Sequence, residues 1–144
     1  MYKFSRNSLK NLEGIHPNLV NVCVHALSMQ KIDFGVIKNS FRTVEQQKEN
    51  MRKGLSKTMD SLHLPQSDGY SHAVDLFWYK DGIDVFKLER SPNISSKQID
   101  HGWNTLTFCM YQAAIKYKIP LGWGGFWKGA WDKPHYYILR DREK

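Results

Sequence analysis

The chain has 144 residues, of which 41% are hydrophobic and 13% aromatic, enough for one domain with a substantial apolar core. No stretch approaches the roughly 20 consecutive apolar residues of a transmembrane helix, and the N-terminus lacks the apolar core of a signal peptide. We therefore expect a protein made in a cytoplasm. The net charge of +7 favours contact with polyanions, but the basic residues are too scattered to indicate a sequence-specific reader of nucleic acid.

The first third of the chain predicts two helices and a strand. Residues 5–12 form a short helix for which Ser5 is a possible cap. A second helix begins at Pro17, a residue that suits a first helical turn, and extends to about Gln30. Residues 33–41 are expected to form a strand.

A capping box marks the next helix. The Thr43 hydroxyl and the Gln46 side chain can each satisfy a free backbone donor at a helix start. The polar helix that follows ends at Arg52 or Lys53, and Gly54 closes it.

A long loop, residues 54–71, separates this helix from a hairpin. A loop of that length is usually functional or disordered. Residues 73–79 then predict a strand, Asp81-Gly82 a tight turn, and residues 83–88 the returning strand.

The last third contains the longest helix. Ser95 and Gln98 form a second capping box, and the helix ends before Pro120. A segment rich in Gly and Trp, residues 121–127, leads to a final strand over 135–139. Elements in this order predict an α+β domain with a small antiparallel sheet packed against helices.

Two imidazoles and two carboxylates in the chain could form a metal site. They belong to His63, Asp75, Asp132 and His135. Zinc prefers such ligands, and a catalytic zinc site uses three of them and leaves a fourth position for water. Side chains alternate along a strand, so Asp75 is expected to face a partly apolar environment, where an unpaired carboxylate is costly. A metal ion or a salt bridge to Lys or Arg would remove that cost.

The residues around Pro134 suggest how the fourth group could act. Pro134 restricts Lys133 to extended conformations, so Asp132 lies three positions before His135 on a rigid segment. The carboxylate could then take a proton from a water molecule while the imidazole binds the ion, as metal-assisted hydrolysis requires. The alternative for Asp132 is a turn-capping role. Its neighbour Trp131 either packs in the core or forms a wall of a substrate groove.

Four motifs follow one another along nearly the whole chain. They are residues 8–17, Ser40-Phe41-Arg42-Thr43 with Gln46, Ser61-x-His63 with Ala73-x-Asp75, and Asp132-x-Pro134-His135. In this order they resemble the zinc D-Ala-D-Ala carboxypeptidase and dipeptidase family, and most closely its branch of phage L-alanyl-D-glutamate endopeptidases, which are endolysins. The resemblance implies the fold that these peptidases share with hedgehog domains. It also implies that residues 1–144 form a single catalytic domain without a separate cell-wall-binding domain.

The resemblance further implies a role for each polar residue of the motifs. His63, Asp75 and His135 would bind Zn²⁺, and Asp132 would act as the general acid and base. Arg42 would polarise the scissile carbonyl or hold a substrate carboxylate, and its fork of donors suits either task. Ser61 and Gln46 would contact or support the substrate.

One spacing departs from the family pattern. The family places its histidine seven positions before its aspartate, whereas His63 precedes Asp75 by twelve. The extra residues, in the region 65–70, lengthen a loop at an entropic cost of only about 0.6 kcal/mol per doubling of length, and Ser71 replaces a glycine. His72 is an alternative ligand to His63, although its spacing from Asp75 predicts opposite faces of the strand. We expect no metal role for His16, His25 and His101.

The function implied by the resemblance is cleavage of the L-Ala–D-Glu bond in the stem peptide of peptidoglycan, which lyses the host cell. The enzyme would be a monomer, held in the host cytoplasm until it is released to the periplasm or cell wall. Alternatives are a D-Ala-D-Ala carboxypeptidase of the same family, a non-catalytic zinc-binding module, and, on charge alone, a nucleic-acid-binding protein. Asp132 favours catalysis, because a structural zinc site is closed by four ligands and needs no base.

Overall fold

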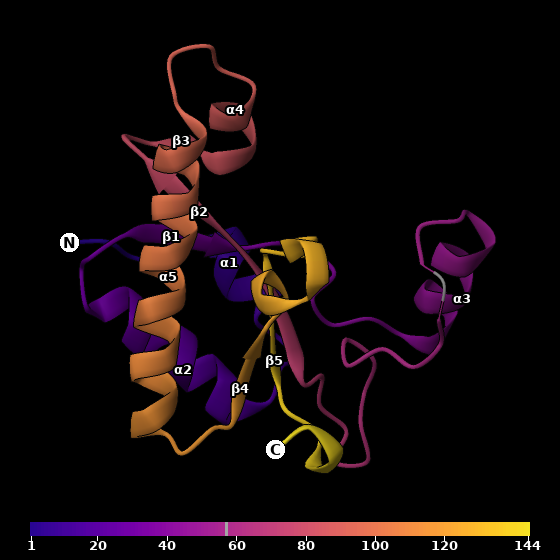
Figure 1. Ribbon diagram of the computed structural model, residues 1–144. Coiled ribbons are helices and arrows are strands. Elements are labelled where there is room, and N and C mark those ends of the chain that lie inside the picture. Colours follow the sequence, from indigo (N-terminus) through magenta and orange to yellow (C-terminus); the bar gives the residue numbers. More distant parts are fainter. Residues whose placement is uncertain (57) are drawn as a thin grey trace.

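The computed structural model describes residues 1–56 and 58–144 and shows a small sheet covered by helices (Figure 1). The strands are β1 (Asp33–Val36), β2 (Ala73–Lys80), β3 (Ile83–Asp84), β4 (Leu121–Trp123) and β5 (His135–Ile138). The helices are α1 (Arg6–Asn11), α2 (Pro17–Ser28), α3 (Val44–Arg52), α4 (Val85–Glu89) and α5 (Ser96–Lys116). Short 3₁₀ turns are η1 (Gly124–Phe126), η2 (Lys128–Ala130) and η3 (Asp141–Glu143).

The sheet is antiparallel throughout and is organised around β2. Its strand order is β1-β2-β5-β4, and β3 pairs with the end of β2. The first half of β2 pairs with β5, and its second half pairs with β1 and β3. In the β2–β5 pairing Asp75 lies opposite His135. The α+β class predicted from the sequence is therefore confirmed, and the register brings two of the predicted ligands together.

The core lies between β2 and the helices α2 and α5. Alternate side chains of β2 point inward, and Val74, Leu76 and Trp78 are buried there. From the helices, Leu19, Val22, Trp103, Leu106 and Met110 complete this core. No helix in the described part of the chain has the length and apolar character needed to cross a membrane.

Local sequence signals explain most of the element boundaries. Both predicted capping boxes are present, at Thr43 with Gln46 and at Ser95 with Gln98. Asp81 and Gly82 both have positive φ, 51° and 78°, as a two-residue hairpin turn of the mirror-image type requires.

Three sequence predictions need correction. The strand predicted over 33–41 ends at Val36, because the chain turns at Asn39, whose φ of 66° is left-handed. The returning strand predicted over 83–88 is only Ile83–Asp84, since the Asp84 carboxylate accepts the Lys87 N–H and starts α4. The segment 121–127, to which we assigned no strand, contains β4.

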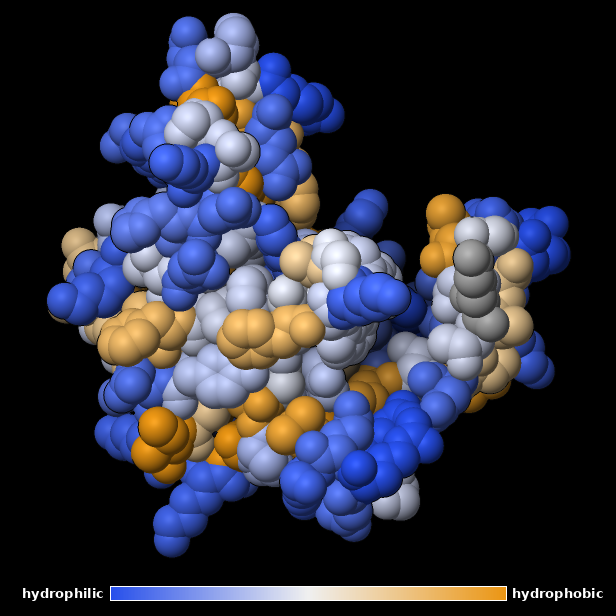
Figure 2. Space-filling view, in the orientation of Figure 1, coloured by the Kyte–Doolittle hydropathy of each residue, from blue (hydrophilic) through white to orange (hydrophobic). Residues whose placement is uncertain are grey.

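Helix α3 and the turn after it, residues 43–56, stand apart from the body of the molecule, and we call them the arm (Figure 1). Figure 2 shows a hollow between the arm and the body. Gln47 is the one buried residue of α3. Helix α3 therefore packs no buried apolar side chain against the body.

The contact between Gly102 of α5 and Trp78 of β2 yields a test of the packing. A Cβ at Gly102 would lie 2.2 Å from the Trp78 ring. In an ordinary helix Gly→Ala stabilises by about 0.5–1 kcal/mol, but overpacking costs about 1–3 kcal/mol. We expect Gly102→Ala to lower the free energy of unfolding measured in urea. The control Asn104→Ala, at an exposed position of the same helix, should not lower it. A Gly102→Ala protein as stable as the wild type would contradict this packing.

Candidate active site

Three of the predicted ligands converge at one point. His63 Nε2 lies 3.2 Å from His135 Nδ1 and 3.4 Å from Asp75 Oδ1, and the last two atoms are 3.1 Å apart. Both imidazoles are buried and the carboxylate is partly buried. The metal-binding trio predicted from the sequence is thus a compact cluster in the folded chain.

The sheet and the long loop position these side chains in different ways. Asp75 and His135 are directly opposed on β2 and β5, and the Leu76 N–H donates to the Pro134 carbonyl beside them. His63 comes from the loop between α3 and β2. Its carbonyl accepts the Arg42 N–H at 3.0 Å, which ties the loop to the start of the arm.

Ser40, which is fully buried, connects the loop to the strand. Its carbonyl faces His63 Nδ1 at 2.7 Å, and its hydroxyl accepts the backbone N–H of Asp75 at 3.0 Å. The buried Ser71 hydroxyl lies 3.2 Å from the same carbonyl and donates to it or to other carbonyls nearby. Because a carbonyl only accepts, His63 must carry its proton on Nδ1, so the Nε2 lone pair points into the cluster.

The donor set fits a zinc ion. Zinc binds His nitrogen and carboxylate oxygen at about 2.0–2.2 Å, so tetrahedral ligands lie about 3.3–3.5 Å apart, close to the distances between His63, Asp75 and His135. Metal-binding histidines usually donate their other N–H to a carbonyl or carboxylate, and the contact between His63 and Ser40 supplies that arrangement.

The electrostatics keep Asp75 ionised. Burial opposes its charge, but the contacts of its carboxylate with the imidazoles of His135 and His63 outweigh burial and hold the pKa of Asp75 well below its usual range. The pKa of Asp132, in contrast, is raised, chiefly by burial and also by the charge of Asp75, against opposing effects of His135, His63 and Arg42. Two carboxyl groups in one cleft thus have pKa values shifted in opposite directions, which is typical of sites with separate acid–base roles.

Arg42 is held by a residue that the sequence analysis missed. Its Nη1 donates to Gln47 Oε1 at 2.9 Å, and the Gln47 amide donates to the Ser56 hydroxyl and the Thr58 carbonyl. Gln46, for which the resemblance implies contacting or supporting the substrate, caps α3 from an exposed position and is not among the residues that line the cleft. The side chain of its neighbour Gln47 is buried. Because α3 is polar on all sides, its sequence has no apolar periodicity that could show which of the two glutamines faces inward.

A cleft of about 940 Å³ joins these groups. Its lining includes the three candidate ligands and Asp132, Arg42, Ser61, Trp127, Trp131, Arg140 and Arg142. Trp131 is 71% exposed on the wall, whereas Trp123 packs in the core. Of the two alternatives given for Trp131, the structure therefore favours the groove wall.

His72, the alternative ligand, is not part of this cluster. It faces away from Asp75 and lies beside His16 and Asp68 in a second group of possible ligands. The longer loop thus brings the side chain of His63, and not that of His72, to the cleft.

The fold and the site define a small α+β domain with an open His/Asp/His cluster and an acidic side chain in one cleft. The chain matches the family model of phage L-alanyl-D-glutamate peptidases over residues 1–138. It belongs to that family.

Individual relatives are similar over different shares of the chain. The L-alanyl-D-glutamate peptidase of Escherichia phage T5 is 34% identical over 89 residues, which cover 61% of this chain and 63% of that protein. The crystal structure of the Serratia marcescens L-Ala D-Glu endopeptidase ChiX has a TM-score of 0.72 and 28% sequence identity, with 99% of this chain and 95% of that chain covered.

The contact between His63 and Ser40 predicts a tautomer. In metal-free protein above the pH at which imidazoles lose their charge, His63 should carry its proton on Nδ1, because only that N–H can donate to the Ser40 carbonyl. Long-range ¹H–¹⁵N correlation spectra distinguish the two ring nitrogens. His101, exposed on α5, is the reference for an imidazole outside the cleft. A proton found on Nε2 of His63 would rule out the inferred orientation.

Proposed function

We propose that the chain hydrolyses the L-Ala–D-Glu bond of peptidoglycan stem peptides with a Zn²⁺ ion held by His63, Asp75 and His135. The observation that carries this proposal is the cluster of three ligand atoms, 3.1–3.4 Å apart, that lines a cleft shared with Asp132 and Arg42. Membership of the peptidase family supports both the reaction and the bond.

The three ligands fix where the reaction occurs. Zinc bound there would act as a Lewis acid and would lower the pKa of a water molecule. Ser40 keeps the His63 lone pair directed at the ion, and the β2–β5 register keeps Asp75 and His135 side by side. Three protein ligands leave room for water or substrate, unlike the four-ligand sites of structural zinc.

Asp132 moves the proton. It takes a proton from the attacking water and returns it to the amine that leaves. Burial raises the pKa of its carboxyl group towards the working pH, and a base whose pKa lies nearer the working pH transfers protons more effectively.

Arg42 gives the cleft a preference for acidic peptides. Gln47 orients the Arg42 guanidinium, which stabilises the negative charge that develops on the carbonyl oxygen or binds a substrate carboxylate. Arg140 and Arg142 also line the cleft, where both form ion pairs with Asp60. Ser61 and Trp131 line the cleft and contact the substrate.

We propose that residues 1–144 act as one catalytic domain, as a monomer, on the host cell wall.

Product analysis distinguishes this activity from its nearest rival. Digestion of purified sacculi by the endopeptidase exposes new N-terminal D-Glu, whereas a D-Ala-D-Ala carboxypeptidase releases free D-Ala.

A gel shift at physiological salt tests the nucleic-acid alternative, since weak and strongly salt-dependent binding is non-specific.

Replacing the proposed base provides the sharpest test of the mechanism. Asp132→Asn keeps the shape of the side chain but cannot take the proton, so the rate of wall hydrolysis should fall by about 10²–10⁴, the usual contribution of a general base. Zinc content, measured by elemental analysis, should stay at the wild-type value. Asp81→Asn, at an exposed position of the turn between β2 and β3, is the matched control. Full activity of Asp132→Asn would refute the assigned base.

The ligand set makes a separate prediction about the metal. After dialysis against low buffered free zinc, the wild type should retain one tightly bound equivalent and His63→Ala should retain none, because two ligands from one sheet bind far more weakly than three. His101→Ala should behave as the wild type. Equal zinc retention by His63→Ala and the wild type would show that His63 is not a zinc ligand.

A further inference from the structure

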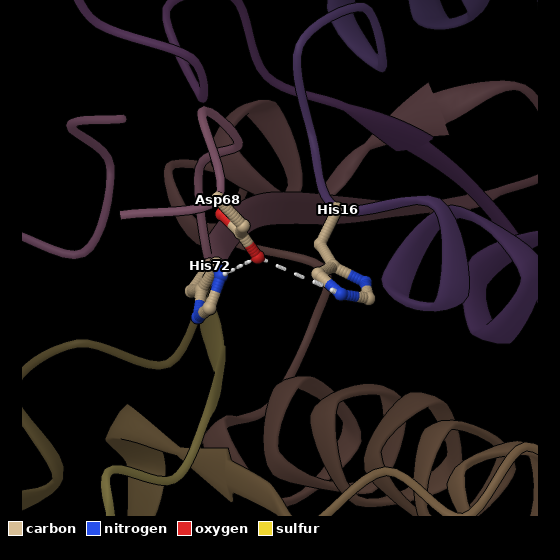
Figure 3. Close-up of side chains that lie close together, drawn as sticks. All are labelled: His16, Asp68 and His72. Carbon is tan, nitrogen blue, oxygen red and sulfur yellow. Dashed lines mark hydrogen bonds and ion pairs between the residues drawn. The ribbon is translucent and has the colours of Figure 1, made fainter. Parts of the chain in front are cut away.

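A second group of ligand side chains lies outside the cleft, where the long loop meets the start of α2. Figure 3 shows the Asp68 carboxylate between the rings of His16 and His72. Asp68 Oδ2 is 2.8 Å from His72 Nε2 and 3.8 Å from His16 Nε2. One ligand atom from each residue lies within 4.8 Å of the others.

The backbone fixes the two imidazoles beside each other. Ile15 forms a parallel bridge with Ser71, the His16 N–H donates to the Ser71 carbonyl, and the Ser71 N–H donates to the Gly14 carbonyl, both at 2.9 Å. His16 and His72 therefore follow directly from two paired segments that are far apart in the sequence.

The turn over residues 66–70 presents the carboxylate. The Gln66 N–H donates to the Tyr70 carbonyl and the Gly69 N–H to the Gln66 carbonyl. Asp68 Oδ1 accepts the Tyr70 N–H at 3.0 Å, which leaves Oδ2 to face both rings. This turn falls within the stretch of the loop that exceeds the family spacing.

We propose that His16, Asp68 and His72 form a second binding site for a divalent transition metal, with Zn²⁺ as the best fit, that clips the long loop to the start of α2. Two imidazoles and one carboxylate are the same donor set as in the cleft, and such a set suits zinc rather than Ca²⁺ or Mg²⁺. The side chains are 24–39% exposed, so water completes the coordination.

The second site must bind zinc more weakly than the cleft. His16 Nδ1 accepts the Asn18 N–H at 3.1 Å and caps α2, so a neutral His16 ring carries its proton on Nε2, towards Asp68. Metal binding at Nε2 moves that proton to Nδ1 and ends the capping contact. In the cleft, by contrast, the tautomer of His63 is already the one that a metal needs. Zinc therefore fills the cleft first and the second site afterwards.

The clip acts on the segment that carries a cleft ligand. The His72 N–H donates to the Leu62 carbonyl, next to His63, and the His72 carbonyl accepts the Ile138 N–H of β5. Fixing His72 and Asp68 to the start of α2 holds the last part of this loop against the body of the protein. The site is a structural clip, separate from the reaction.

The experiment is a zinc titration by equilibrium dialysis with elemental analysis. We expect two equivalents of zinc in the wild type, one in Asp68→Asn and in His72→Ala, and two in the control His101→Ala. Asp68→Asn keeps the size of the side chain and lies on an exposed turn, so it should not prevent folding. The Asn18 amide resonance should shift only as the second equivalent binds, because its hydrogen bond to His16 is lost.

The His63→Ala variant, which lacks one proposed cleft ligand, separates this proposal from the one for the cleft. In His63→Ala the remaining weak equivalent should still raise the unfolding temperature as zinc is added, and His63→Ala with His72→Ala should abolish that rise. One equivalent in the wild type that only His63→Ala removes would overturn the second site and leave the cleft intact. An equivalent removed by His72→Ala but not by His63→Ala would support the second site and overturn the proposed cleft ligands. Equal losses in Asp68→Asn and His101→Ala would mean adventitious surface binding only and would overturn the clip.

Discussion

The hydrogen bonds of Ser40 hold together two chain segments that would otherwise be independent. Its carbonyl orients His63 from the long loop, and its hydroxyl takes the backbone N–H of Asp75 from the central strand. Ser40 is buried, so losing one partner would leave a polar group unsatisfied at a cost of about 1–3 kcal/mol. That cost keeps the imidazole and the carboxylate in one place. The rest of the cleft is arranged around this pair, because His135 takes its position from the strand partner of Asp75.

Much of this arrangement could be predicted from the sequence, and the reasons are local. The capping boxes and the Asp81-Gly82 turn depend on residues a few positions apart, so their signals are direct. The candidate ligands His63, Asp75 and His135 came from motif spacing and family resemblance, and the structure brings them together. The cross-strand register that joins Asp75 to His135 follows once β2 and β5 are known to pair, although the sequence does not state which strands pair.

Other features depend on contacts between distant segments, which leave no local signal. Gln47 differs from Gln46 only in the direction of its side chain, yet it is buried and orients Arg42. Residues 121–123 looked irregular because Gly122 lowers strand propensity, but their pairing with β5 makes them a strand. His16 was set aside as a helix-start residue. It does cap α2, and the long loop also brings Asp68 to its other nitrogen.

Helix α3 buries no apolar side chain, and the hydrogen bonds of Gln47 join the arm internally and to its flanking residues Arg42 and Thr58. Its detachment would therefore expose little new surface to solvent. Urea should therefore hardly change the rate of amide hydrogen exchange in α3, because the openings that permit exchange there expose little surface. In the core of α5 the exchange rate should rise with urea as global unfolding does. Gln47 belongs to the arm, so such an opening would also free the guanidinium of Arg42 from its acceptor and change the charges that the cleft presents to a peptide.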